Sequence, residues 1–219
     1  SPQGVRLEAM RLAIFGGTFN PPHHGHLGIA SHVLKETEFT TVLFVPTHIP
    51  AHKERSDQVS ASDRLEMTRL MCNADDALRV DSCDIERGGV SYSIDTVADV
   101  LRRYEVSGRP GFVLGDDLIE GFASWHRVDE FVKQVELLVA HRQWPEEVEL
   151  GFPHRYLSNP LVSVSSRDIR RRVAKGLPID GLVTEAVKRY ISDKGLYACS
   201  ESPLSESAPD GCGDGERRG

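Results

Sequence analysis

Three histidines fall within four residues in the segment GGTFNPPHHGHL (residues 16–27). Gly16 and Gly17 before them allow a backbone to approach a bulky anion without interference from a Cβ. The segment leads into a helical pattern, and the first N–H groups and the positive dipole end of a helix attract phosphate. His23 and His26 stand three residues apart across that junction, so both imidazoles can face one ligand. These residue types at this spacing predict a site for a polyphosphate that gains charge during a reaction.

Two other interpretations of the same segment stay open. Imidazole binds zinc, copper and nickel, although no cysteine or carboxylate lies among residues 16–27 to complete a metal site. A purely structural turn would account for the glycines and prolines, and it leaves the histidine pair unexplained. The polyphosphate interpretation uses all of these residues, because Gly25 leaves room for a ligand between His23 and His26.

Strand patterns alternate with helical patterns along the rest of the chain. Short apolar runs predict strands at 11–15, 41–46, 77–85, 111–115, 135–140 and 161–165, the first of which ends at Gly16 and Gly17. Apolar residues at helical spacing predict helices from about residue 26 and over 65–74, 94–101, 130–134, 167–174 and 184–193. The alternation predicts an α/β fold: a Rossmann-like, doubly wound parallel sheet in a single domain, with helices on both faces. Ligands of such sheets bind beyond the carboxyl ends of the strands, and the histidine segment follows the first of them.

The composition bounds the domain organisation and excludes several classes of protein. The 219 residues are 39% apolar, enough for one core, and we expect one domain over 10–199, a flexible extension at 1–9 and a disordered tail at 200–219. No apolar run approaches the ~18 residues that cross a bilayer, and the first residues lack the apolar stretch of a secretory signal. A net charge of −7 disfavours a protein that coats a nucleic-acid duplex. The four cysteines show no CxxC spacing, which indicates a reducing cytoplasm rather than a disulfide scaffold.

Six segments in order resemble a known family. GGTFNPPHHGHL resembles the GGTFDPxHxGH signature of the nucleotidyltransferase superfamily, and specifically of the bacterial nicotinate mononucleotide adenylyltransferases. The other segments that are similar to motifs of this family are IPAHK (49–53), GGVSYSIDTV (88–97), LGDDLIEGFASWH (114–126), VSVSSRDIRRRV (162–173) and GLVTEAVKRYISDKGLY (181–197). Three positions depart from the family pattern, because Asn20 stands where many members carry Asp, Ser93 where Thr is usual, and Arg167 at a Thr. The first two keep a hydrogen-bonding group, and Arg167 has no clear role.

The resemblance implies a reaction that suits these residues. Members join nicotinate mononucleotide to the AMP part of ATP, with Mg²⁺ accompanying ATP, and they release pyrophosphate to form nicotinate adenine dinucleotide. The attacking phosphate oxygen is already anionic, so the reaction needs alignment of two polyanions and neutralisation of charge rather than a general base. ATP and nicotinate mononucleotide are thus the expected partners, with no nucleic acid, no membrane and no metal held by the protein itself. A homo-oligomer is left open.

The resemblance and the expected strand ends together assign candidate site residues. The catalytic candidates are His23, His26, Lys53 and Arg170. The ATP-binding candidates add Gly16, Gly17, Thr18, Phe19, Gly115, Asp117, Ser165 and Ser166. The candidates for binding nicotinate mononucleotide are Asn20, His52, Lys53, Ser93, Trp125 and His126, with Trp125 stacked on the pyridine ring and Ser93 and the backbone at His126 meeting the carboxylate.

Each candidate also has a simpler interpretation. His52 and Lys53 could be a solvated loop pair, and the basic run at 167–172 a solvated helix face. Asp117 could be a helix cap, and Trp125 could be core. At the level of function, the alternatives are a sister nucleotidyltransferase with the same first motif and a catalytically inactive nucleotide-binding regulator. The regulator is disfavoured because a binder does not need transition-state cations.

Overall fold

The structure is a computed structural model of the chain, and it describes residues 9–51 and 59–198. The expected extension, apart from its last residue, and the expected tail at 200–219 therefore lie outside the described residues. So do the candidate residues His52 and Lys53. None of the helices in the described ranges has the length and apolar content needed to cross a bilayer.

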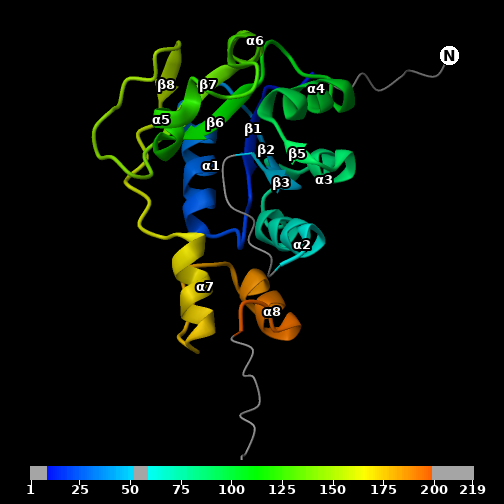
Figure 1. Cartoon of the computed structure of the whole chain (residues 1–219), viewed down its shortest axis with the longest axis vertical. Coiled ribbons are helices and arrows are strands. Elements are labelled where there is room, and N and C mark those ends of the chain that lie inside the picture. Colours follow the sequence, from blue (N-terminus) through cyan, green and yellow to red (C-terminus); the bar gives the residue numbers. More distant parts are fainter. Residues whose placement is uncertain (1–8, 52–58, 199–219) are drawn as a thin grey trace, which may run out of the picture.

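Six parallel strands form the central sheet, in the order β4-β2-β1-β6-β7-β8 (Figure 1). They are β1 (Leu12–Gly17), β2 (Thr41–Pro46), β4 (Leu78–Val80), β6 (Gly111–Gly115), β7 (Glu136–Ala140) and β8 (His154–Tyr156). Ile14 in β1 pairs with Leu43 of β2 on one side and with Phe112 of β6 on the other. The chain winds outward from β1 in one direction and from β6 in the other, so the strand order reverses between these two strands. This is the doubly wound parallel sheet that the sequence predicts.

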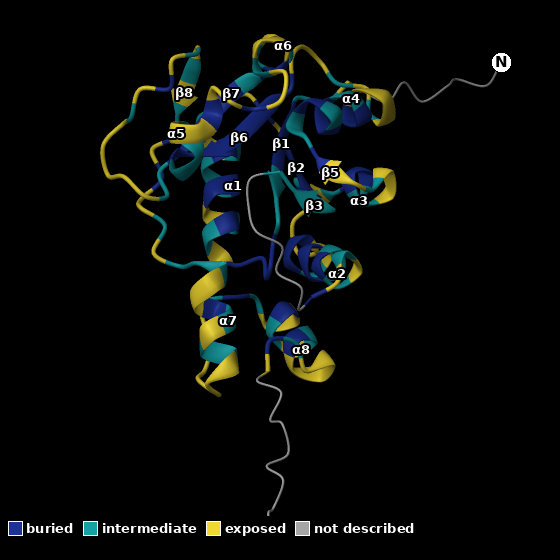
Figure 2. Cartoon of the chain, viewed as in Figure 1, coloured by how far each residue is buried: buried dark blue, intermediate teal, exposed yellow. Residues whose placement is uncertain are grey.

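Helices cover both faces of the sheet, as expected. Successive side chains of a strand point to opposite faces, and this alternation divides the buried apolar residues into two clusters. Ala13 and Phe15 share one cluster with α1 (His24–Glu36), α2 (Ala61–Cys72), α7 (Ser166–Ala174) and α8 (Glu185–Lys194). Leu12 and Ile14 share the other with α3 (Cys83–Arg87), α4 (Ser93–Arg103), α5 (Ile119–Phe122) and α6 (Val128–Gln134). Figure 2 shows the central strands buried between these layers, whereas α7 has much exposed surface.

A second, two-stranded sheet ties the loop after β2 to the start of α4. Its strands are β3 (Ile49–Pro50) and β5 (Val90–Ser91), which pair in parallel. The backbone N–H of His48 donates to Ser91 Oγ at 2.9 Å, and the His48 ring lies 3.0 Å from the carbonyl oxygen of Gly89. The loop after β2 and the segment that leads into α4 are therefore held together.

Three expectations about element boundaries are wrong. β1 does not end before Gly16 and Gly17, because both pair with β2. Residues 77–85 are not one strand: pairing ends at Val80, and α3 begins at Cys83. The expected strand at 161–165 has no ladder, because β8 occupies that edge beside β7 and the later segment packs on α1 instead.

Candidate active site

His23 and His26 hold the start of α1 together. His23 is the N-cap residue, and its Nδ1 accepts from the N–H of Gly25 at 3.1 Å. The Nδ1 of His26 accepts from the N–H of His23 at 3.1 Å, and the two rings stack with centroids 3.8 Å apart. Because each Nδ1 is an acceptor, the proton of a neutral imidazole resides on Nε2. The capping bonds thus fix the tautomer and make each Nε2 a donor.

The loop before this helix supports His26 from the core side. Phe19 has a φ of 49°, and its ring packs against Phe15 and Phe44 and edge-on against His26, with centroids 4.9 Å apart. A Cβ at Gly17 would lie 2.9 Å from the Phe19 ring. Gly17 is therefore required by this packing, and Phe19 could meet ATP only through its backbone.

The N-terminal half of α7 is fastened to the same loop. Ser166 Oγ donates to the carbonyl oxygen of Pro21 at 2.8 Å, and Arg170 Nη1 donates to that of Asn20 at 2.7 Å. Ser165 caps α7 by accepting from the N–H of Asp168 at 3.1 Å. The buried Asn20 side chain accepts from the Tyr197 hydroxyl. The structure thus gathers candidates of the first motif and of the motif at 162–173 around one loop.

A pocket with a cavity volume of about 110 Å³ opens at the carboxyl ends of β1 and β6. Five of the expected residues line it, namely Gly16, Gly17, Thr18, Ser93 and Trp125. Trp125 is 9% exposed and packs on three phenylalanine rings (Phe112, Phe122 and Phe131). The indole therefore belongs to the core and also forms a wall of the pocket. Its stacking on a pyridine ring stays a prediction.

The two aspartates after β6 have separate tasks. The buried Asp116 accepts three backbone N–H bonds from residues 142–144 at 2.8–3.1 Å. Asp117 is half-buried, and its Oδ1 lies 3.9 Å from Nη1 of Arg142. A Cβ at Gly115 would lie 2.3 Å from Asp117 Oδ1, so this glycine permits the approach. Asp116 thus holds the backbone of residues 142–144 at the end of β6, whereas Asp117 faces the side chain of Arg142.

Comparisons with known proteins identify the family. The sequence profile of the cytidylyltransferase-like family matches residues 14–172. A probable nicotinate-nucleotide adenylyltransferase of Borreliella burgdorferi is 39% identical over 188 residues, which are 86% of this chain and 97% of that protein. The chain belongs to the nicotinate-nucleotide adenylyltransferase family. The nicotinate-nucleotide adenylyltransferase of Bacillus subtilis is 34% identical over 187 residues, 85% of this chain and 98% of that protein.

A solved structure shares the fold of this adenylyltransferase. It is described as the Plasmodium falciparum nicotinic acid mononucleotide adenylyltransferase complexed with NaAD. The two align with a TM-score of 0.67 at 18% identity, over 85% of this chain and 96% of that one. The predicted family and the Rossmann-like fold are both confirmed.

Most of the described candidates do not line this pocket. The ones outside its wall are Phe19, Asn20, His23, His26, Gly115, Asp117, His126, Ser165, Ser166 and Arg170. Asn20 is buried, and the His126 side chain is exposed with its ring 4.4 Å from that of Tyr92. Sequence reasoning in turn missed five polar residues that do line the pocket, which are Thr47, Asp84, Ser91, Thr96 and Arg142.

Asp84 is the buried acid of this pocket. Its Oδ1 accepts from Thr96 Oγ1 and from Arg87 Nη2, both at 2.8 Å. Burial raises the pKa of Asp84, and the bonds from Thr96 and Arg87 oppose that shift. No sequence signal distinguishes this aspartate from its exposed neighbours, because its partners lie on two different elements.

The described residues offer Mg²⁺ no cage of protein ligands beside the histidines. Within residues 9–51 and 59–198, one group of three metal-ligand side chains lies close together: Cys83, Asp84 and Asp99. The guanidinium of Arg87 already contacts both carboxylates of that group.

Proposed function

We propose that the protein transfers the adenylyl group of ATP to nicotinate mononucleotide, giving nicotinate adenine dinucleotide and pyrophosphate in NAD biosynthesis. The observation that carries this proposal is the stacked His23–His26 pair. It lies at the N-terminus of α1, at the end of the loop that follows β1, and Thr18 of that loop lines the pocket at the point where the strand order reverses. Polyanions bind at such helix ends, and the family relation supplies the reaction class.

The chemistry of the transfer asks for positioned cations and donors. A phosphate oxygen of the mononucleotide attacks the α-phosphorus of ATP, a new P–O bond forms, and the bond to the β-phosphate breaks with departure of pyrophosphate. The Nε2–H groups of His23 and His26 would donate to phosphate oxygens whose charge rises in the transition state. Arg170 and Lys53 are proposed to add positive charge, and Mg²⁺ bound with ATP would neutralise phosphate charge. No enzyme nucleophile is required.

The pocket suits the mononucleotide half of the reaction. Trp125 offers a flat wall for the pyridine ring, while the Ser93 hydroxyl and the backbone N–H at His126 are the proposed donors to the carboxylate. We propose that Asp117 accepts from a ribose hydroxyl of the adenosine half.

Cys72 and Cys83 are buried free thiols, and they support the proposed cytoplasmic location.

A turnover assay tests this function. Pyrophosphate release from MgATP is measured with nicotinate mononucleotide and, in parallel, with nicotinamide mononucleotide, and the dinucleotide product is identified by chromatography. We expect turnover with a higher kcat/KM for the nicotinate form. CTP in place of ATP is the control for a sister nucleotidyltransferase. Pyrophosphate release with CTP but not with ATP would overturn the proposal. Binding of both substrates without turnover would favour the inactive regulator.

A further inference from the structure

Arg64 lies in α2, yet its guanidinium reaches the two loops that border the pocket. Nη1 donates to the carbonyl oxygen of Thr18 at 2.7 Å. Nη2 donates to the carbonyl oxygens of Thr47 at 2.6 Å and His48 at 3.3 Å. Thr18 follows β1 and Thr47 follows β2, and both line the pocket. One side chain therefore joins the carboxyl ends of two neighbouring strands.

This guanidinium is buried, and its hydrogen-bond partners within residues 9–51 and 59–198 are backbone carbonyl oxygens. Arg64 is 4% exposed, and within the described residues no carboxylate lies within 4.0 Å of its nitrogens. Burial lowers the pKa of Arg64, although a guanidinium in a protein stays protonated at any ordinary pH. A buried charge is costly unless it is paired, and the three carbonyl oxygens provide only dipoles. An anion in the adjacent site would complete the pairing.

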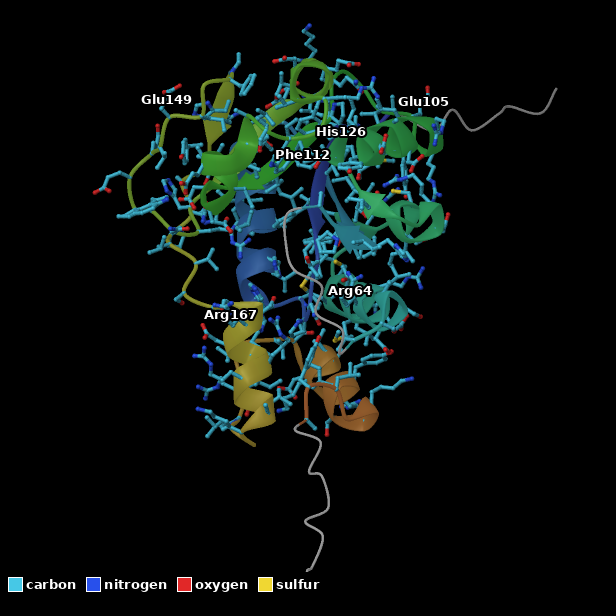
Figure 3. The ribbon with its side chains drawn as sticks, in the orientation of Figure 1. Arg64, Glu105, Phe112, His126, Glu149 and Arg167 are labelled. Atoms are coloured by element: carbon cyan, nitrogen blue, oxygen red, sulfur yellow. The ribbon has the colours of Figure 1, made fainter. Side chains whose placement is uncertain are left out.

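A second arginine approaches the same loop from α7. Arg170 donates to the carbonyl oxygen of Asn20, two residues beyond the carbonyl that Arg64 binds. Figure 3 labels Arg64 at α2 and Arg167 at the start of α7, on opposite sides, in this view, of the chain that leaves β1. Positive charge thus reaches the loop from two helices.

We propose that Arg64 is a positioning residue for adenylyl transfer. It fixes the loops after β1 and β2 to each other, and it adds positive charge next to the backbone that would meet the phosphates of the substrates. The inference rests on the proposed function. The planar fork of arginine suits both tasks, because it presents several donors in fixed directions and stays charged. Lysine has a compact ammonium and would keep the charge without the fork.

Three variants separate the two tasks. Arg64→Met keeps the side-chain stem and removes charge and donors, Arg64→Lys keeps the charge, and Arg64→Ala leaves a space that ethylguanidinium can enter. Arg69→Met is the matched control, because Arg69 lies on the same helix with a half-exposed side chain paired to Glu66. We expect kcat/KM to fall about 10- to 100-fold in Arg64→Met, as misplacement of reacting groups does elsewhere, and to be unchanged in Arg69→Met. In Arg64→Lys the charge remains but the fork is lost, so KM for ATP should change less from its wild-type value than kcat does.

Chemical rescue distinguishes positioning from simple stability. Ethylguanidinium should restore activity to Arg64→Ala, whereas ethylammonium at the same concentration should not. A folded Arg64→Met within about threefold of wild type in kcat/KM, or a folded, inactive Arg64→Ala that ethylguanidinium does not rescue, overturns the proposal. If both of these variants unfold, Arg64→Lys decides: unchanged kcat at an unchanged melting temperature overturns it, and reduced kcat supports it.

A direct binding measurement keeps this inference separate from the reaction. If the wild-type protein does not release pyrophosphate, the proposed function fails, and the role of Arg64 is judged from MgATP affinity by isothermal titration calorimetry. Affinity reduced about tenfold in Arg64→Met and unchanged in Arg69→Met supports the role. Equal affinity in all three proteins overturns it.

Discussion

Replacement of His26 tests the dual role that the structure gives this residue. Its Nδ1 caps α1 by accepting from the N–H of His23, and its ring packs edge-on against Phe19. His26→Ala removes the cap, the ring contact and the Nε2–H donor together. Loss of a cap typically costs 0.5–2 kcal/mol, so we expect a melting temperature lower by roughly 1–8 °C for a domain of this size. Loss of one donor to a developing charge should lower kcat by ~10²–10³.

His26→Glu separates the two effects. His26 is the third residue of α1, where the side chain of a glutamate can accept from the N-cap N–H in a capping box. The glutamate therefore restores the cap, but a carboxylate cannot donate to phosphate and repels it. We expect His26→Glu to be more stable than His26→Ala and no more active. Stability should thus recover in His26→Glu, whereas activity should not.

The assay is pyrophosphate release at saturating MgATP and nicotinate mononucleotide, with melting temperatures from circular dichroism. His24→Ala is the control, because His24 is the exposed first residue of the same helix and should tolerate the change. If kcat rises from His26→Ala to His26→Glu in step with stability, His26 acts only as a cap. A near wild-type kcat in His26→Ala would also refute the reasoning.

Four further changes have defined outcomes. Ser93→Ala should shrink the acid-over-amide ratio of kcat/KM, because one donor to the carboxylate is worth ~1–3 kcal/mol, whereas Trp125→Phe should raise KM for both mononucleotides at an unchanged ratio. Truncation after Ser200 should leave melting temperature and activity unchanged, because residues 201–219 contain little apolar surface, and a drop of several degrees would contradict this. Burial of Glu36 works to raise its pKa, but hydrogen bonds from Ser158 and His32 outweigh burial and lower it from 4.5 to about 2. Glu36 should therefore stabilise the fold above pH 4.5 and lose that effect as the pH falls towards 2, and melting curves of Glu36→Gln should converge with those of the wild type over this window; a constant gap between the two would exclude the effect.

Local periodicity accounts for what the sequence predicts correctly about the fold. A strand repeats every two residues and a helix every 3.6 residues, so the apolar pattern of 11–15 and the spacing after His26 are visible without a partner. The same holds for the capping serines, because Ser60 and Ser165 precede their helices and accept from N–H groups three residues later. The histidine segment belongs to this class as well, since its two capping bonds span only two and three residues.

Strand pairing is the first property that the tertiary structure decided. The alternation LVSVS at 161–165 is typical of a strand, but the short β8 takes the position beside β7, and the later segment packs on α1 through Val162. Gly16 and Gly17 look like a chain break, yet β2 provides partners that keep both in the ladder. Register and pairing depend on residues far along the chain, which local patterns do not contain.

By itself, then, the sequence determined the element types, the parallel two-faced sheet, the histidine segment and the family. Burial of polar side chains was decided by the tertiary structure alone. Arg64 and Asp84 look like ordinary surface charges in the sequence, and Asp116 is indistinguishable from Asp117. Arg64 becomes a bridge only because β1 and β2 end side by side above α2, and Asp116 an anchor only because residues 142–144 return to β6. A charged side chain acquires such a role from the acceptors or donors around it, and those come from elements that only folding brings together.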